Sequence, residues 1–364
     1  MAVLKRILVS NYRNIAFQEL DFCPKINCIS GGNGEGKTNL LDAIWYLSMT
    51  KSAFAPSDKF NFRHGCNSFS ISGEYLVDGK STRIGISVED GSEKKIKRDD
   101  KVYRKASDHI GLLPVVMVSP ADTSLVSESG DERRKFANAV LSQMDRKYLS
   151  DLQQYNRVLA QRNSLLKSGA ADESLLDTLD ERLEALGAPV YEKRKEFADR
   201  LSPLVGKYYR EISGGEENVS IEYRSDLAKG PLADMLKSGR DRDRILKFTF
   251  CGVQRDDFLF GLDGYPIRKC GSQGQQKSFL VALKFAQYEL MAGYGSPILL
   301  LDDLFDKLDM NRVENLLRTV SGNGFGQIFL SDSNKHRLSS IMEKLGTERS
   351  YCEAKGGVFT RIDE

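Results

Sequence analysis

Residues 31–38 place the strongest constraint on what this chain can fold into. Their sequence, GGNGEGKT, matches the pattern G-x-x-x-x-G-K-[ST] of a phosphate-binding loop. The apolar residues 26–29 before the loop predict a buried strand, and apolar residues at helical spacing after it predict a helix. The loop is therefore expected to hold a phosphate at a helix N-terminus, where free backbone N–H groups and the helix dipole attract anions.

This loop supplies the first group of candidate site residues. Lys37 is expected to reach the β- and γ-phosphates of ATP and so to assist catalysis, and the Thr38 hydroxyl is expected to bind Mg²⁺. Glycines suit the loop because their backbone can approach a phosphate closely. The candidate cofactor-binding residues here are Gly31, Gly32, Asn33, Gly34, Glu35, Gly36, Lys37, Thr38 and Asn39.

A second part of the site is predicted at residues 297–303, PILLLDD. An apolar run typical of a buried strand is followed by Asp302 and Asp303, which places both acids at the carboxyl end of the strand, beside the phosphate loop. Asp302 is expected to hold Mg²⁺, directly or through water, and Asp303 to polarise the attacking water as a catalytic residue. ATP and Mg²⁺ are the expected cofactors.

Residues 271–276, GSQGQQ, open a second helical pattern that carries small residues at its start. Ser272 suits the N-cap position, and the exposed amides there form a second anion site. Two phosphate-binding helix ends in one chain suggest that the second acts across a dimer, where Ser272 and Gly274 of one subunit hold the γ-phosphate bound by the other. The spacing alone leaves a simple capped helix as an open alternative.

The composition suits a globular protein without membrane segments. The 364 residues are 40% hydrophobic and 29% charged, and no apolar run approaches the length of about 20 residues that a membrane helix needs. No signal peptide is expected at the N-terminus. Six cysteines without C-x-x-C spacing predict reduced, mostly buried thiols in a cytoplasmic protein. The net charge of +2 means that any nucleic-acid contact needs a local basic patch.

The order of patterns predicts a split domain. Strands are expected in the first third and the last third of the chain, and three or four long helices between about 130 and 210, where Pro189 and Pro203 punctuate the pattern. We expect a nucleotide-binding domain at 1–120 and 245–364, with a helical arm or lid inserted at 121–244. The expected strands cover residues 4–10, 16–22, 69–77, 81–89, 113–119, 219–223, 247–250, 258–261, 297–301 and 327–330, with a further hairpin at 94–103.

Seven segments spread over the chain resemble, in the same order, the RecF family of bacterial recombination mediators. They lie at 8–15, 31–44, 118–136, 141–143, 254–260, 271–287 and 297–309. The resemblance implies an α/β fold with an ABC-type P-loop ATPase head, which combines a mixed sheet with an antiparallel β lobe, and an inserted helical arm. In this family the segment SQGQQ corresponds to the signature motif of SMC-like ATPases.

The resemblance also implies a function and further site residues. It implies ATP-driven dimers that bind duplex DNA and single-strand/double-strand junctions, that act with RecO and RecR to load RecA at gaps, and that are released by hydrolysis. The shorter acid Asp303, in place of a glutamate, fits a weak, DNA-stimulated ATPase that works as a switch. By motif position the site residues include Arg13, Gln275 and Asp309 near the nucleotide, and Ser331 where transporters carry a switch histidine.

Two basic groups are candidate DNA contacts. Lys94, Lys95, Lys97 and Arg98 belong to the densest basic cluster, and Arg133 and Arg134 lie in the first helix of the arm. For each group an ordinary solvated surface is the alternative. Recognition of the DNA backbone with little sequence specificity is expected, because no base-reading motif is visible.

Two other functions share parts of these patterns. The ATPase subunit of a membrane transporter would carry a similar phosphate loop and acidic strand, but with Ser-Gly-Gly-Gln in its signature and a switch histidine. A small-molecule kinase would need no signature helix. Homodimerisation and DNA binding without membrane attachment are therefore the favoured expectation.

Overall fold

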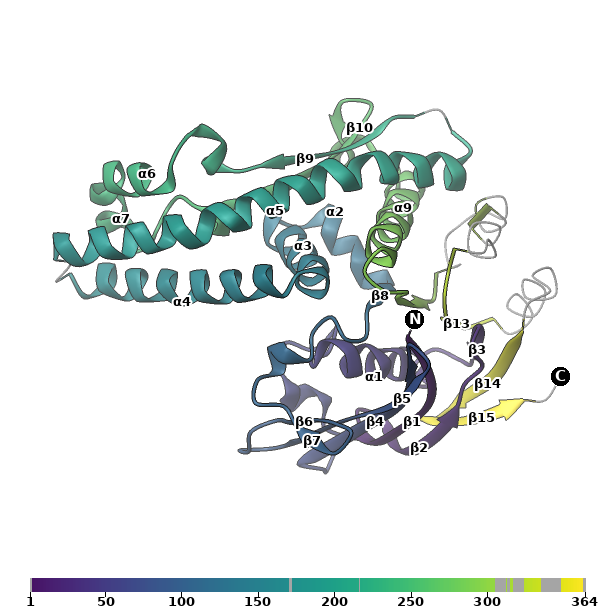
Figure 1. Ribbon diagram of the computed structural model, residues 1–364. Helices are drawn as coiled ribbons and strands as arrows, with labels where there is room; N and C mark the ends of the chain where they lie inside the picture. Colours follow the sequence, from purple (N-terminus) through teal and green to yellow (C-terminus); the bar gives the residue numbers. More distant parts are fainter. Residues whose placement is uncertain are drawn as a thin grey trace. The chain divides into compact units, whose positions relative to one another are not determined.

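The computed structural model describes residues 2–169, 172–215, 217–304, 312, 315–316, 324–334 and 348–362. The chain forms two compact units, coloured along the sequence in Figure 1. The first unit comprises residues 1–123, 208–215 and 273–364, and the second comprises residues 124–207 and 216–272. No helix among the described residues combines the length and the apolar content needed to cross a bilayer.

A mixed sheet with the order β15-β14-β3-β13-β12-β8 forms the centre of the first unit. All of its neighbouring strands run parallel except β15, which pairs antiparallel with β14. Every residue of the four strands from β3 to β8 in this order is buried, as expected for parallel strands covered on both faces. The strands are β3 (Ile26–Ser30), β8 (Val115–Val118), β12 (Ile298–Asp302), β13 (Ile328–Asp332), β14 (Arg349–Lys355) and β15 (Val358–Ile362).

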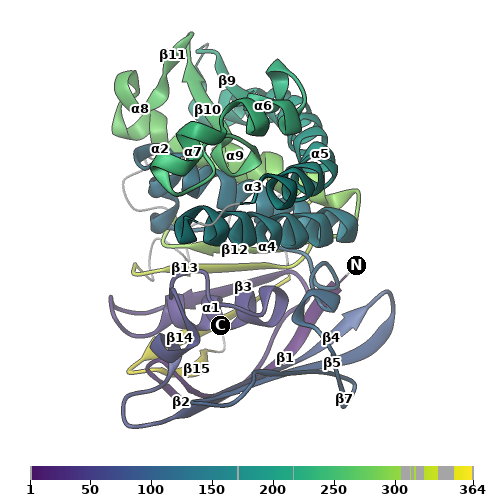
Figure 2. The same cartoon turned by 90° about the vertical axis from the view of Figure 1, so that its left-hand side faces the viewer.

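A second, antiparallel sheet with the order β2-β1-β4-β5-β6-β7 completes the first unit. Helix α1 (Lys37–Met49) lies between the two sheets (Figure 2) and contacts strands of both. For this reason its apolar residues are buried, apart from the partly exposed Trp45. The strands are β1 (Ala2–Tyr12), β2 (Ile15–Asp21), β4 (Ser68–Val77), β5 (Lys80–Glu89), β6 (Lys95–Arg98) and β7 (Lys101–Val102). Helix α9 (Gln273–Ala292) packs against β8 of the mixed sheet.

Long helices dominate the second unit. Besides them it contains a three-stranded antiparallel sheet in the order β11-β10-β9. The helices are α2 (Ser124–Ser127), α3 (Gly130–Met144), α4 (Arg146–Ser168), α5 (Glu173–Ser213, of which residues 208–213 belong to the first unit), α6 (Leu232–Ser238), α7 (Arg240–Leu246) and α8 (Ile267–Cys270). The strands are β9 (Val219–Arg224), β10 (Asp257–Leu262) and β11 (Tyr265–Pro266).

Two buried ion networks hold these helices together. Arg194 on α5 is 1% exposed and donates hydrogen bonds to Asp256 Oδ2 and Val253 O, each at 2.6 Å, to Asn138 Oδ1 at 3.0 Å, and to the Tyr148 hydroxyl at 3.1 Å. In the other network, Arg162 on α4 pairs with Asp180 and Asp243, both at 2.6 Å. Buried charges need such partners, because an unpaired ion in the protein interior is very costly.

The predictions from the sequence differ from the structure in four respects. Strands β14 and β15 were not predicted. The predicted strand at 247–250 is wrong, because Lys247 has a φ of 59° and ends α7 in a turn. Pro189 and Pro203 do not divide the arm into separate helices, since both lie inside the continuous α5. The cysteines are less buried than expected, with only Cys28 fully buried.

The division of the chain also differs from the expected boundary at residue 245. Residues up to 272 belong to the second unit, because β10 pairs with β9 along its whole length and so joins that unit's sheet. Residues 208–215 belong to the first unit although they continue α5. Both differences depend on contacts between distant segments, which periodicity along the sequence does not reveal.

Candidate functional site

The phosphate loop follows β3 and leads directly into α1. Gly31, Gly34 and Gly36 have φ angles of 151°, 83° and 111°, which only glycine adopts easily. A Cβ atom at Gly31 would lie 2.4 Å from the backbone oxygen of Ala354, so no side chain fits there. The loop therefore has the backbone conformation and the helix N-terminus that a phosphate requires.

The turn between β14 and β15 supports this loop from the other end of the chain. Gly357 N donates a hydrogen bond to the backbone oxygen of Glu35 at 2.9 Å, and Gly356 N donates to the Glu35 carboxylate. A Cβ at Gly357 would meet the backbone oxygen of Asn14 at 2.3 Å. The Glu35 carboxylate is thus engaged by the turn, and cofactor binding by Glu35 as a residue of the phosphate loop stays a prediction.

Lys37 is the first residue of α1, is 6% exposed, and reaches back into the loop. Its ammonium donates hydrogen bonds to the backbone oxygens of Gly31 at 2.7 Å and Gly32 at 2.8 Å. The loop thus encloses the one charge that can neutralise phosphate oxygens from within it. Asn33, by contrast, is exposed to solvent.

Three oxygen-bearing side chains meet beside the loop, at the carboxyl ends of β12 and β13. The Thr38 hydroxyl donates to Asp302 Oδ2 at 2.8 Å, and the Ser331 hydroxyl donates to Asp302 Oδ1 at 2.6 Å. Burial raises the pKa of the Asp302 carboxyl, against the opposing effect of these two hydrogen bonds. Thr38 and Asp302 together offer the hard oxygen ligands that Mg²⁺ prefers. Ser331 orients Asp302 in this arrangement.

Asp303 has an unusual conformation for an aspartate at the end of a strand. Its φ is 47°, in the left-handed region, and its backbone N–H donates to the backbone oxygen and the hydroxyl of Ser331, both at 3.2 Å. Its carboxylate atom Oδ1 is buried and has no hydrogen-bond partner among the described residues. A buried acceptor without a partner is costly, so this oxygen fits a site that receives a further polar group.

Arg13 lies next to the loop but its guanidinium is fully engaged by other side chains. It pairs with the buried Asp42 at 3.0 Å and donates to Asn39 Oδ1 at 3.1 Å and to Ser52 Oγ at 3.0 Å. Asn39 in turn donates to Asn14 Oδ1 at 2.7 Å. Arg13 and Asn39 thus brace the start of α1. Neither Asp42 nor Asn14 was singled out from the sequence, because isolated polar residues give no pattern.

Residues 271–276, the segment that resembles the signature motif, lead into α9, which begins at Gln273. Ser272 directly precedes this helix and is exposed, while Gly274 and Gln275 in its first turn are partly buried. A Cβ at Gly274 would come within 2.4 Å of Arg312 Nη1, so a side chain there would displace this arginine. Asp309, expected in the same part of the site, lies outside the described residues.

A buried ion pair that the sequence did not reveal connects α9 to the end of β8. Lys284 is 8% exposed, and its ammonium lies 2.7 Å from Asp122 Oδ1, while Asp122 Oδ2 accepts a hydrogen bond from Ser119 N at 2.7 Å. The same part of the chain lines a small cavity that Asp302 and Asp303 border. The pair therefore fixes α9 relative to the acidic end of the site.

The six basic candidates for DNA contact fall into two groups, those bound by other parts of the protein and those on the exposed surface. Lys94 pairs with Asp58 at 2.7 Å and donates to the backbone oxygen of Thr50, so it serves the fold of the antiparallel lobe. Arg133 pairs with Asp257 through two nitrogens at 2.8 and 3.0 Å, and Arg134 donates to the backbone oxygen of Asp256. The candidates on the exposed surface are Lys95, Lys97 and Arg98 of β6.

Comparisons with known proteins agree with this geometry. The model of the family described as RecF/RecN/SMC N terminal domain matches residues 3–349. The DNA replication and repair protein RecF of Parabacteroides distasonis is 44% identical over 364 residues, and the match covers 100% of both chains. That of Phocaeicola vulgatus is 43% identical over 100% of this chain and 99% of its own length.

Solved structures show the same relationship. One described as the recombination mediator protein RecF-ATP in the RecFOR pathway has a TM-score of 0.89 at 30% identity, covering 100% of this chain and 98% of its own. The Smc head domain of Pyrococcus furiosus has a TM-score of 0.59 at 14% identity, covering 100% of this chain and 96% of its own, and so shares the fold.

The mixed sheet, the phosphate loop and these likenesses define an ABC-type P-loop ATPase head of the SMC class. Within that class, the chain belongs to the RecF family of DNA replication and repair proteins. The alternative of a transporter ATPase subunit receives no support from these findings.

Proposed function

We propose that the protein is an ATP-dependent DNA-binding recombination mediator that works as a homodimer. ATP binding would close two copies around duplex DNA or a junction between single- and double-stranded DNA at a gap. In this state the dimer would help RecO and RecR to load RecA. Slow, DNA-stimulated hydrolysis would then release it. The proposed place of action is the cytoplasm.

The observation that carries this proposal is the 2.8 Å hydrogen bond between Thr38 and Asp302. This bond joins the start of α1, directly after the phosphate loop, to the acidic end of β12. The proposed phosphate-binding loop and the proposed cation-binding carboxylate therefore meet at one place. Two solved structures, described as RecF-ATP and RecF-ATPrS and 30% and 29% identical over the full chain, support ATP as the nucleotide.

Each site residue then has a proposed role. When bound, Mg²⁺-ATP supplies the reactive phosphoryl group and the cation that offsets its charge. Lys37 and the loop amides would bind the phosphates, and Thr38 and Asp302 would hold the cation. Asp303 would orient the attacking water and accept its proton. Such catalysis consists mainly of positioning and charge stabilisation.

The exposed start of α9 is the proposed contact across the dimer. Ser272, Gly274 and Gln275 would complete the nucleotide site of the partner subunit, together with Asp309. The exposure of Ser272 beside a helix N-terminus supports this role, because its hydroxyl and the helix dipole would both favour a phosphate.

Replacing Ser272 with Arg tests the contact across the dimer. The variant is expected to bind ATP as the wild type does, because its own loop is intact, and to remain monomeric with Mg²⁺-ATP by light scattering. Ser150→Arg, at an exposed position on α4, is the matched control and should dimerise normally. Dimers of Ser272→Arg at the wild-type ATP concentration would refute a role across the interface.

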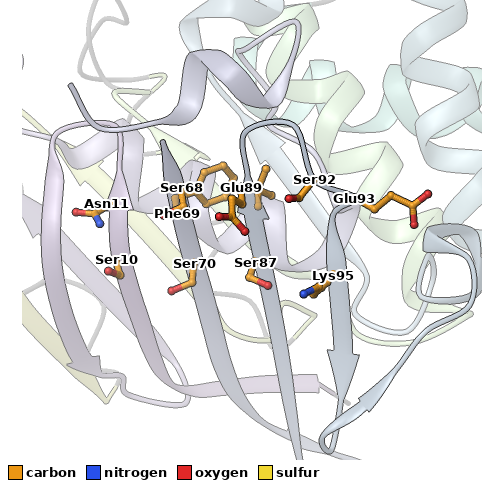
Figure 3. Close-up of a pocket in the computed structure, with 11 residues that line it drawn as sticks. Ser10, Asn11, Ser68, Phe69, Ser70, Ser87, Glu89, Ser92, Glu93 and Lys95 are labelled. Atoms are coloured by element: carbon orange, nitrogen blue, oxygen red, sulfur yellow. The ribbon is translucent and has the colours of Figure 1, made fainter. Parts of the chain in front are cut away.

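The proposed DNA surface lies on the antiparallel lobe. Ser10, Ser70, Ser87 and Lys95 are neighbours in register on four adjacent strands, and Figure 3 shows them in one row across the sheet. They border a hollow of about 280 Å³, which also includes Glu89 and Glu93. Hydroxyl and ammonium groups are the usual donors to DNA phosphates, and Lys97, two residues beyond Lys95 on β6, extends the row on the same face.

Charge reversal tests this surface. Lys95→Glu/Lys97→Glu should lower the affinity for a gapped duplex at least about tenfold, and should reduce the slope of log K against log salt by about two. ATP affinity should not change. Lys25→Glu/Lys59→Glu alters the net charge equally at exposed positions of the same unit and serves as the control. Equal losses of affinity in both variants would remove the assignment of DNA binding to β6.

A further inference from the structure

A short exposed segment follows α7 in the second unit. Ile245 is 81% exposed, Leu246 38% and Phe248 39%, so three large apolar side chains lie within four consecutive residues on the surface. In Figure 1 the segment lies beside the end of the α4–α5 hairpin, where α6 and α7 also lie. Contiguous exposed apolar surface of this kind usually marks an interaction site.

Buried hydrogen bonds to α4 fix both ends of this segment. Asp243 and Thr249, which flank it, are both buried and both bind Nη1 of Arg162, at 2.6 and 2.9 Å. Asp243 Oδ1 also accepts from Phe250 N, and Thr249 N donates to Asn163 Oδ1 at 2.8 Å. The exposed residues therefore form a fixed loop, and preorganisation lowers the entropy lost when a surface binds a partner.

Three cations belong to the same segment, and two of them, Arg242 and Arg255, lie over the ring of Phe250. Arg242, Lys247 and Arg255 are exposed and form no ion pair with a carboxylate among the described residues. Arg244, in contrast, is bound by Glu173. The Arg242 guanidinium lies 3.3 Å from the centre of the Phe250 ring. An apolar centre with a rim of unpaired positive charge is complementary to an apolar segment that carries acids.

We propose that residues 242–255 form a docking site for a segment of another protein that combines large apolar side chains with aspartate or glutamate. A nucleic acid fits less well, because only Phe248 of the three exposed apolar residues offers a ring for base stacking, and Arg242 covers the Phe250 ring. A second copy of the same loop would oppose like charges. The proposal goes beyond the ATP-dependent function and does not depend on it.

The test uses the full-length protein and a phage-displayed library of random peptides. Peptides are selected on the wild type and counter-selected on Ile245→Ser/Phe248→Ser, and the selected sequences are synthesised with fluorescein for anisotropy. A second variant, Arg242→Glu/Lys247→Glu, tests the charges. Tyr294→Ser removes an apolar side chain of similar exposure from the first unit and is the control. Thermal unfolding verifies that each variant is folded.

Selection should yield acidic peptides with large apolar residues. Their Kd should rise at least about tenfold in both double variants, as for the loss of an interface hot spot, and should stay within about twofold in Tyr294→Ser. Failure to select such peptides, or equal binding by the variants, would overturn the proposal. So would an equal loss of affinity for a poly(dT) oligonucleotide in Ile245→Ser/Phe248→Ser, which would make the loop a nucleic-acid surface.

Discussion

Replacing Asp303 with Asn is expected to slow ATP hydrolysis by about 10²- to 10³-fold while leaving ATP binding intact. The substitution removes the charge and the proton-accepting capacity of an oxygen that has no hydrogen-bond partner among the described residues, whereas Lys37, Thr38 and Asp302 remain in place. With hydrolysis blocked, Mg²⁺-ATP should hold the protein in its dimeric state. Phosphate release and light scattering measure the two effects.

Lys37→Ala distinguishes a loss of binding from a loss of catalysis. This variant should lose nucleotide affinity and therefore both hydrolysis and dimerisation, because the charge inside the loop is gone. Hydrolysis by Asp303→Asn at the wild-type rate would show that another group acts on the water. A monomer throughout, with ATP bound, would show instead that nucleotide binding does not drive association.

Replacing Arg194 with Met is expected to destabilise the second unit by about 3–5 kcal/mol. The change leaves Asp256, which is 1% exposed, as a buried carboxylate without its ion-pair partner, and also removes hydrogen bonds to Val253 and Tyr148. Urea unfolding followed by far-UV circular dichroism reports on the helices. Fluorescence of Trp45, the only tryptophan of the chain, reports separately on the first unit.

The loss of folding stability in Arg194→Met should depend on pH. Burial raises the pKa of the Asp256 carboxyl even with Arg194 beside it. Without Arg194, the folded state would bind this proton still more strongly than the unfolded state, so the variant should regain stability as the pH falls from 7 towards 5. Arg200→Met, on the same helix but in an exposed pair with Glu196, should cost less than about 0.5 kcal/mol. Similar losses in the two variants would contradict the importance of burial.

Local patterns predicted the parts of the site that lie within one strand–loop–helix or one strand. The phosphate loop, the strand before it and α1 are where the sequence indicates, since glycine positions and apolar spacing are determined by neighbouring residues. The same holds for β12 with Asp302 and for the start of α9. Only the sheet order shows how close these segments lie, because β13 separates β3 from β12 and its Ser331 contacts Asp302.

Charges were harder to interpret from the sequence. Lys94, Arg133 and Arg134 belong to basic runs typical of a DNA-binding surface, yet each is bound by a partner far away in the sequence. Glu35 likewise contacts Gly356, more than three hundred residues away. Such pairings depend on the tertiary fold, and neither composition nor periodicity contains them.

The pairing of β3 has a consequence for synthesis of the protein. Both neighbours of this strand, β13 and β14, come from the last part of the chain, and the turn after β14 also holds Glu35 of the phosphate loop. Contacts between such distant segments form only after the intervening chain is available. On the ribosome, β3 and the phosphate loop therefore gain these contacts only after nearly the whole polypeptide has emerged, and a nascent or truncated chain lacks them.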